Sequence, residues 1–169
     1  MTLRVAADIE VAAPRAAVWA YVTDPVHTLH FMSDLTRWEI ASEHDRGLGA
    51  RYRTLMRVRS AEIGGLVEVV EYDEPRDLAW TSLTGIDQRG RCRLRERGSH
   101  RTHVELRLSY GAPGGGIAGW LAERVAAPTL RGSLRRSLLE LKRQVEHEQA
   151  RAAAASRRAA ARSAHAARS

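Results

Sequence analysis

The feature that most constrains the fold is a row of large apolar residues late in the chain. It consists of Leu130, Leu134, Leu138, Leu141 and Val145. The gaps of four, four, three and four positions place these side chains on one face of an α-helix, and the opposite face is mostly basic. Such a helix has to cover its apolar face, and each fully buried residue contributes about 1.5–3 kcal/mol. We therefore expect a long helix over Ile117–Val145 that packs on a large surface.

That surface is predicted to be a sheet, because most of the preceding chain alternates apolar and polar residues. The predicted strands cover residues 4–11, 38–40, 51–59, 66–72, 78–84, 89–97 and 103–110. Two short helices follow the first strand directly. One opens at Pro14, and the other has Asp24 as its N-cap and Pro25 at its first position. The order predicts an α+β fold in which a curved antiparallel sheet of about seven strands wraps around the C-terminal helix.

The last two strands can be aligned by their charges. Five arginines occupy every odd-numbered position from residue 89 to residue 97. The even-numbered positions must therefore form the face that is buried away from water. Keeping that face dry requires Leu94 opposite Val104 and Cys92 opposite Leu106, because a slip of one residue would bury the arginines. The loop is then the three residues 98–100. The same register places Arg93 opposite Glu105, where we expect a cross-strand ion pair.

Two features leave a choice open. In the strand 66–72, Val67 and Val69 compete with apolar residues of the other parity, so the strand can face either way. Pro128 lies inside the long helix, where it removes a backbone hydrogen bond, so we expect a kink or two helices in line.

The net charge of +7 belongs mainly to the end of the chain. Residues 149–169 contain five arginines and no acidic residue, and without them the charge is +2. The predicted domain therefore spans residues 1–148, followed by an Ala/Arg-rich tail that projects or frays. Such a tail can bind nucleic acid or an anionic membrane. It contains no aromatic residue to stack on bases and no large apolar residue to enter a bilayer, so a solvated end is the simpler interpretation.

Metal and cofactor chemistry find no support in the sequence. Cys92 is the only cysteine, which excludes an internal disulfide and a Cys-rich metal site. His27 and His30 can share one helix face but have no obvious third ligand. The glycines at 114–116 precede a helix without a phosphate-binding motif around them, and we expect them to form a lid or hinge. We therefore expect neither a metal nor a cofactor.

The sequence also bears on location. Residues 1–11 lack the apolar core of a signal peptide. No apolar run approaches the roughly 18 residues of a membrane span. We expect a cytoplasmic protein, and the sequence does not indicate its oligomeric state.

Three stretches carry a resemblance to a known family. They are Ile9–Pro14 with Val18–Asp24, then Val69–Trp80, and finally Leu134–Glu146. Together they resemble the polyketide cyclase/dehydrase and lipid-transport branch of the SRPBCC (START-like) superfamily, over about Thr2–Glu148. The resemblance implies a helix-grip fold with an apolar cavity between sheet and helix, and a hydrophobic small molecule or lipid-like ligand inside it. It implies no particular chemistry, because this fold hosts carriers, sensors, cyclases and co-chaperones.

The candidate ligand-binding residues follow from the predicted strand facing. They are Trp38 at a possible mouth, Tyr52, Met56, Trp80, Ser82, Cys92, Leu106 and Tyr110 on the sheet, and Leu134 on the helix. Apolar walls with a few polar groups are typical of ligand sites. The same residues also suit a filled core, and the sequence does not decide between the two.

Two further functions stay open. An aromatase/cyclase-type enzyme would need an acid and a base in the cavity, for which Glu68, His27, His30 and Asp34 are the candidates. The last three lie in or just after the second short helix, and the simpler interpretation is that they are exposed helix and loop residues. Alternatively, the basic tail could make the protein a partner-binding adaptor.

Overall fold

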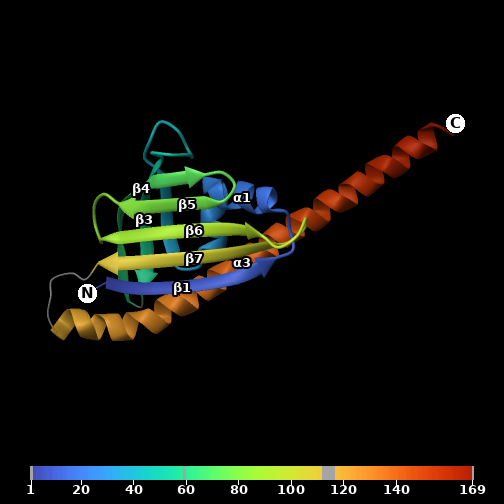
Figure 1. The fold of residues 1–169 in the computed structure, drawn as a ribbon. Helices are drawn as coiled ribbons and strands as arrows, with labels where there is room; N and C mark the ends of the chain where they lie inside the picture. Colours follow the sequence, from blue (N-terminus) through green and yellow to red (C-terminus); the bar gives the residue numbers. More distant parts are fainter. Residues whose placement is uncertain (1, 59, 112–116, 169) are drawn as a thin grey trace.

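The sheet is antiparallel throughout and has the strand order β1-β7-β6-β5-β4-β3-β2. The computed structural model describes residues 2–58, 60–111 and 117–168, without the side chains of 58 and 117–126. The predicted hinge at 114–116 lies outside these residues. The elements are β1 (Thr2–Val11), α1 (Arg15–Thr23), α2 (Pro25–Phe31), β2 (Leu35–Ile40), β3 (Arg51–Val58), β4 (Ala61–Asp73), β5 (Asp77–Ser82), β6 (Gln88–Glu96), β7 (Thr102–Gly111) and α3 (Ile117–Ala166). This arrangement confirms the predicted helix-grip class (Figure 1).

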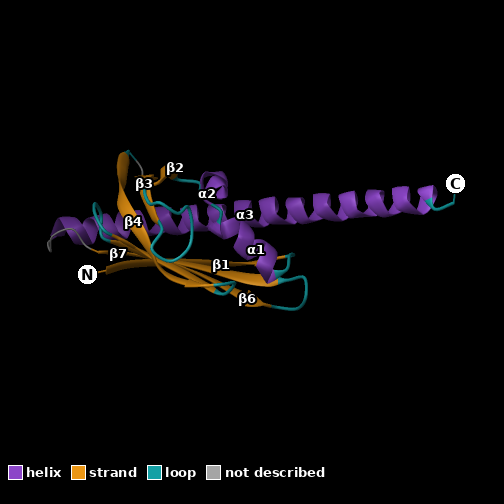
Figure 2. Ribbon diagram, turned by 90° about the horizontal axis from the view of Figure 1, so that it is seen from above, coloured by secondary structure: helices purple, strands orange, loops and turns teal. Residues whose placement is uncertain are grey.

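The sheet curls around α3, as the apolar stripe requires. All five stripe residues are at most 5% exposed, whereas Leu139 on the outer face is 60% exposed. Figure 2 shows α3 passing through the curve of the sheet, with β2 and β3 on one side of the helix and β1 and β6 on the other. The helix packs mainly on β1. The stripe therefore forms one core with the inward side chains of β1, β6 and β7.

The predicted register of the β6–β7 hairpin is confirmed, but the predicted ion pair between Arg93 and Glu105 is wrong. Leu94 lies opposite Val104, and the loop closes with the amide of Arg97 donating to the carbonyl of Arg101 over 2.9 Å. Arg93 lies opposite Glu105 as predicted, yet its guanidinium contacts Asp77 at 3.4 Å. The Asp77 side chain is only 12% exposed and needs cationic partners, whereas Glu105 pairs with an arginine on its own strand. Burial of the carboxylate therefore decides the pairing.

A β-bulge explains why the facing of β4 could not be assigned. Val67 and Val69 point inward and are buried. The register then shifts between Val69 and Glu71, so that Val70 is 49% exposed and Tyr72 returns to the inner face. The extra residue at the bulge changes which alternate positions face inward. Apolar residues therefore occur at both odd and even positions of the strand.

Side-chain hydrogen bonds fix α3 to the rest of the fold at two places. The Oγ of Ser137 accepts from the amide of Ser33 over 3.1 Å, just before β2. Further along, Oε1 of Glu146 accepts from the amide of Ala12 at 2.8 Å and from Lys142 at 2.6 Å. These bonds outweigh the effect of burial on the carboxyl, so that the pKa of Glu146 lies below its usual value.

The C-terminal part of α3 extends well beyond the sheet. The helix continues through Pro128 and runs to Ala166 as one element, and Figure 1 shows its last turns projecting into solvent. No side chain of residues 149–168 is buried. The tail therefore projects, and alanine's high helix propensity accounts for its helical state. Within the described chain, no helix is both long and apolar enough to cross a membrane.

Replacing Leu134 should test the contribution of the stripe. Leu134 is 2% exposed, so Leu134→Ala should lower the free energy of unfolding by about 2–5 kcal/mol in urea denaturation. Leu139→Ala, on the same helix but facing solvent, should change it by less than about 0.5 kcal/mol. Equal effects of the two substitutions would contradict the assigned helix face.

Removing residues 149–169 should test the domain boundary that we propose at residue 148. Because those side chains contribute nothing to the core, the shortened chain should melt within about 1–2 °C of the full chain. Differential scanning calorimetry measures the difference. A markedly lower melting temperature would show that the tail belongs to the folded unit.

Candidate functional site

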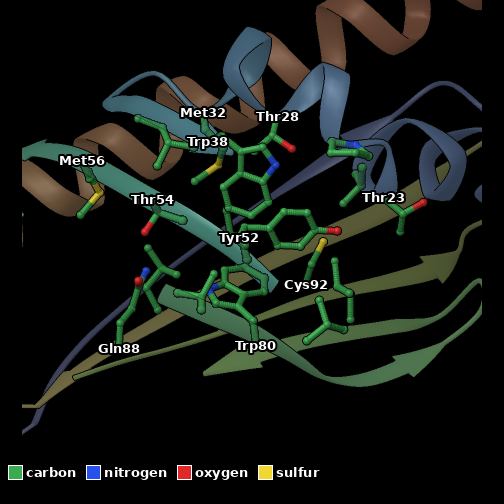
Figure 3. Close-up of a pocket in the computed structure, with 18 of the residues that line it drawn as sticks. Thr23, Thr28, Met32, Trp38, Tyr52, Thr54, Met56, Trp80, Gln88 and Cys92 are labelled. Carbon is green, nitrogen blue, oxygen red and sulfur yellow. The ribbon is translucent and has the colours of Figure 1, made fainter. Parts of the chain in front are cut away.

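A cavity lies between the concave face of the sheet and α3, and α2 borders it. The space open to the centres of water molecules is about 110 Å³. One water needs roughly 10–15 Å³ by this measure, so the cavity has room for a small organic molecule. Figure 3 shows the lining side chains of the sheet and α2 converging on this space. The cavity therefore occupies the position that the predicted fold reserves for a ligand.

The wall is mainly apolar and aromatic. The sheet contributes Trp38, Tyr52, Met56, Val67, Val69, Tyr72, Leu78, Trp80, Cys92, Leu106, Leu108 and Tyr110. The helices contribute Val22, Phe31, Leu138 and Leu141, and Met32 is the C-cap of α2. Leu138 and Leu141 belong to the stripe as well, so the same helix face closes the core and bounds the cavity. Polar groups in the wall are few, which is the usual composition of a small-molecule site.

Trp80 owes its position to a glycine on the neighbouring strand. Trp80 lies opposite Gly90 in the β5–β6 pair. A Cβ atom built on Gly90 would lie 2.0 Å from the indole carbon Cζ2 of Trp80, so a side chain there would collide with the ring. The absence of a side chain at residue 90 lets the indole lie across the strand and form part of the cavity wall.

Two stacked aromatic rings are fixed in another part of the cavity wall. Trp38 on β2 and Tyr52 on β3 are stacked, with ring centroids 4.3 Å apart and planes inclined by 18°. The Tyr52 hydroxyl donates to the carbonyl of Asp45 at 2.5 Å, which ties the pair to the β2–β3 loop. Burial, with a smaller contribution from Asp45, raises the pKa of Tyr52 to about 12. Tyr52 is therefore neutral at physiological pH.

Two further groups of the wall, Cys92 and Tyr110, are also neutral at physiological pH. Burial raises the pKa of the Cys92 thiol to about 12, and Asp77 adds to the effect. The Tyr110 pKa also rises, again mainly through burial. The Tyr110 hydroxyl contacts the sulfur of Met56 at 3.9 Å, and Gln88 lies in the same wall. At neutral pH these groups can donate hydrogen bonds, but they are poor bases.

Charge is confined to one residue of the wall. Arg46 lies in the β2–β3 loop with a side chain 44% exposed, and it contacts Asp45 at 3.3 Å and Asp24 at 3.9 Å. Among the described residues, no Asp, Glu, His or Lys lines the cavity. Because no other charged side chain occurs in the described lining, that lining contains no ionised group that could act as a general base.

Most of the predicted ligand-binding residues lie in this wall. Trp38, Tyr52, Met56, Trp80, Cys92, Leu106 and Tyr110 line the cavity. Ser82 and Leu134 do not. The Oγ of Ser82 accepts from the amide of Gln88 at 2.9 Å, and Leu134 is buried in the core.

The candidate acid and base residues lie outside the cavity. Glu68 would face inward only if Val67 and Val69 faced outward. The opposite holds, and Glu68 bonds Arg51 at 2.6 Å. Asp34 contacts Arg136 at 3.5 Å.

The two candidate histidines do not line the cavity either. The ring of His27 stacks on Tyr21 at 4.1 Å, and His30 is exposed. No group of three possible metal-binding side chains occurs in the described part of the chain.

Sequence reasoning did not identify the residues of α2 and its C-cap that line the cavity. Pro25, Thr28, Phe31 and Met32 all line the cavity. Their spacing of three, three and one positions marks one helix face, which was the available signal. Arg46 and Gly47 were also missed, because a loop side chain has no periodic pattern that would reveal its direction.

Comparison with known proteins agrees with this geometry. The family model for polyketide cyclase/dehydrase and lipid transport matches residues 2–146. A search of curated proteins gave no match. The predicted resemblance to the SRPBCC (START-like) superfamily is thereby confirmed.

Solved structures share the fold at low sequence identity. TTHA0849 from Thermus thermophilus superposes with a TM-score of 0.73 and 20% identity, covering 84% of this chain and 96% of that one. The Zhui aromatase/cyclase from Streptomyces superposes with a TM-score of 0.67 and 22% identity, covering 89% of this chain and 95% of that one. A START superfamily protein from Mycobacterium smegmatis superposes with a TM-score of 0.65 and 18% identity, covering 85% of this chain and 97% of that one. At such identities the likeness concerns the fold.

Substitution of Gly90 should test how the wall is built. Gly90→Ala should push the Trp80 ring out of place and lower the free energy of unfolding by about 1–3 kcal/mol. Gly132→Ala is the matched control: it lies in α3, where the nearest atom is 3.6 Å from the added Cβ, and should raise stability by about 0.5–1 kcal/mol. Urea denaturation measures both values. A neutral Gly90→Ala would show that Trp80 does not depend on this glycine.

Proposed function

Because the chain belongs to the polyketide cyclase/dehydrase and lipid transport family, we propose that it binds a hydrophobic small molecule or lipid-like ligand in the cavity between the sheet and α3. The observation that carries the proposal is a cavity of about 110 Å³ with a mainly apolar wall, built on the helix face that also forms the core. Burying apolar ligand surface there would contribute roughly 25 cal/mol per Å².

The ligand contacts we propose are the predicted residues that line the cavity. They are Trp38, Tyr52, Met56, Trp80, Cys92, Leu106 and Tyr110. The aromatic rings would provide flat surfaces for stacking, and the hydroxyls would orient a polar substituent. Ser82 and Leu134 would act indirectly, by holding the strand end and the helix behind the wall.

Binding fits this wall better than catalysis of a cyclase/dehydrase type. Aldol closure and dehydration need groups that accept and return protons near neutral pH. The described lining contains no carboxylate or imidazole, and the pKa values of Tyr52 and Cys92 are about 12. The side chains could polarise a ligand carbonyl but could not remove a proton efficiently.

Ligand binding can be tested with naphthalene as a neutral apolar probe. The full chain should quench or shift its tryptophan fluorescence on titration, because Trp38 and Trp80 lie in the wall. Its melting temperature should also rise, since a ligand at 100 times its Kd stabilises by about 2.7 kcal/mol. Organic extraction of the purified protein, followed by mass spectrometry, would identify any ligand that copurifies.

Two matched variants make the test specific. Met56→Trp places a larger ring in the cavity wall at a partly exposed position that can adapt, and it should abolish the naphthalene response. Leu139→Trp makes a similar change on the exposed face of α3 and should bind as the wild type does. Equal responses from the two variants, or no response from the wild type, would contradict binding in this cavity.

A further inference from the structure

We propose that the projecting end of α3 binds duplex DNA without regard to base sequence, through arginines that contact the phosphates along the major groove. The segment concerned is the tail helix, defined as residues 149–166 of α3. None of these described residues lines the cavity, so DNA binding is independent of the proposed ligand-binding function.

The tail helix carries charge of one sign. Residues 149–169 contain five arginines and no aspartate or glutamate. In the domain, by contrast, many arginines are offset by carboxylates: Arg95 contacts Asp77 at 3.0 Å, and Arg107 contacts Glu105 at 2.8 Å. No arginine of the tail helix forms an ion pair with any residue that the structure describes. The positive charge of the tail helix is therefore available to an anionic partner.

The helix gathers these arginines on one side. At about 100° per residue, the four arginines of the tail helix fall within about 140° of its circumference. They are Arg151, Arg157, Arg158 and Arg162. The apolar stripe lies roughly opposite on the same projection, and it is the side by which α3 packs on the sheet. The arginines therefore point away from the domain, so a duplex could reach them without meeting the sheet.

The arginines form two rows with small residues between them. Arg157 lies in one row and the other three arginines in the second, and Ala154 and Ala161 lie between the rows. The major groove of B-DNA is about 12 Å wide and admits an α-helix. Alanine side chains would let the helix enter the groove closely, and the two rows would reach phosphates of opposite strands. Guanidinium groups suit phosphate because they donate two parallel hydrogen bonds to it.

The tail helix is presented as a continuous extension of α3. In Figures 1 and 2 its last turns lie clear of the sheet, and all four of its arginines are exposed. Arg158 and Arg162 are four positions apart, where like charges repel each other along a helix. Phosphates would remove this repulsion, and the DNA would release condensed counterions. The sequence alone favours a solvated end, but a helix that is already formed loses little conformational entropy on binding.

Duplex DNA suits this helix better than other partners do. A second copy of the tail helix would add charge of the same sign. A membrane would find no large apolar side chain in residues 149–169 to anchor the helix at its surface. A single strand would find no aromatic ring there to stack on its bases. Duplex RNA has a deep and narrow major groove that does not suit a helix.

Fluorescence anisotropy tests the proposal, with a fluorescein-labelled DNA duplex of about 20 base pairs in about 50 mM NaCl. The test variant of the full chain replaces the arginines of the tail helix with glutamine, which has a similar helix propensity. Its substitutions are Arg151→Gln, Arg157→Gln, Arg158→Gln and Arg162→Gln. We expect the Kd for the duplex to rise at least about tenfold, because four phosphate contacts are lost. Circular dichroism should show an unchanged helix content.

The control variant loses the same net charge from the domain. It replaces four arginines that are exposed and lie outside the tail helix. Its substitutions are Arg4→Gln, Arg53→Gln, Arg131→Gln and Arg135→Gln. Its Kd should stay within about twofold of the wild-type value, because these arginines lie outside the proposed contact. Equal weakening in the two variants would show that the DNA responds only to net charge, and would overturn the proposal.

The dependence of the Kd on salt counts the phosphate contacts. Each neutralised phosphate contributes about 0.9 to the slope of log Kd against log NaCl concentration, so four arginines predict a slope of about 3–4. The test variant should lose most of this slope. Equal slopes in wild type and test variant, or equally tight binding of an RNA duplex of the same length, would contradict groove binding. If the tail helix binds vesicles of phosphatidylcholine and phosphatidylserine in equal amounts but not the DNA duplex, the proposal is overturned in favour of a membrane.

Discussion

The structure depends on the burial of one helix face inside a curled sheet. Leu134, Leu141 and Val145 are almost completely shielded from water, and the opposite face of the same helix is charged. At about 1.5–3 kcal/mol for each large apolar side chain, this contact is one of the main sources of stability in the domain. The hydrogen bonds that Ser137 and Glu146 accept from the backbone of Ser33 and Ala12 fix the position of the helix along the sheet.

The cavity follows from the same contact. α3 packs mainly on β1, and the sheet curls so that β2 and β3 lie on the other side of the helix in the view of Figure 2. The space that remains is bordered by α2 and lined by aromatic rings rather than filled by them. Stacking of Trp38 on Tyr52 and the seating of Trp80 over Gly90 hold these rings against the strands. Rigid side chains on regular elements are well suited to keep such a cavity in shape.

Much of the fold could be predicted from the sequence, because regular periodicity reports regular structure. The stripe on α3 and the arginine parity of β6 each allow one arrangement, and both are confirmed. The facing of β4 could not be assigned, because the bulge before Glu71 changes the parity within the strand. The expected partner of Arg93 was wrong, because the burial of Asp77 is a tertiary property that no spacing reveals.

The wall of the site was predictable where it consists of strand residues. Alternation indicates which side of the sheet Tyr52, Trp80 and Tyr110 occupy, and all three line the cavity. The direction of Ser82 at the end of β5 and the contribution of the loop residue Arg46 depend on local hydrogen bonds and loop geometry. Periodicity gives no information on either, nor on whether inward side chains meet or leave a space between them.

Ligand binding requires that this space between the sheet and α3 exists and accepts an apolar molecule. A crystal of the full chain pressurised with xenon tests it directly, since xenon enters dry apolar cavities. We expect xenon density between Trp80 on the sheet and Leu138 on α3. A continuous core without xenon, in which side chains from the sheet and α3 touch across the whole interface, would contradict it.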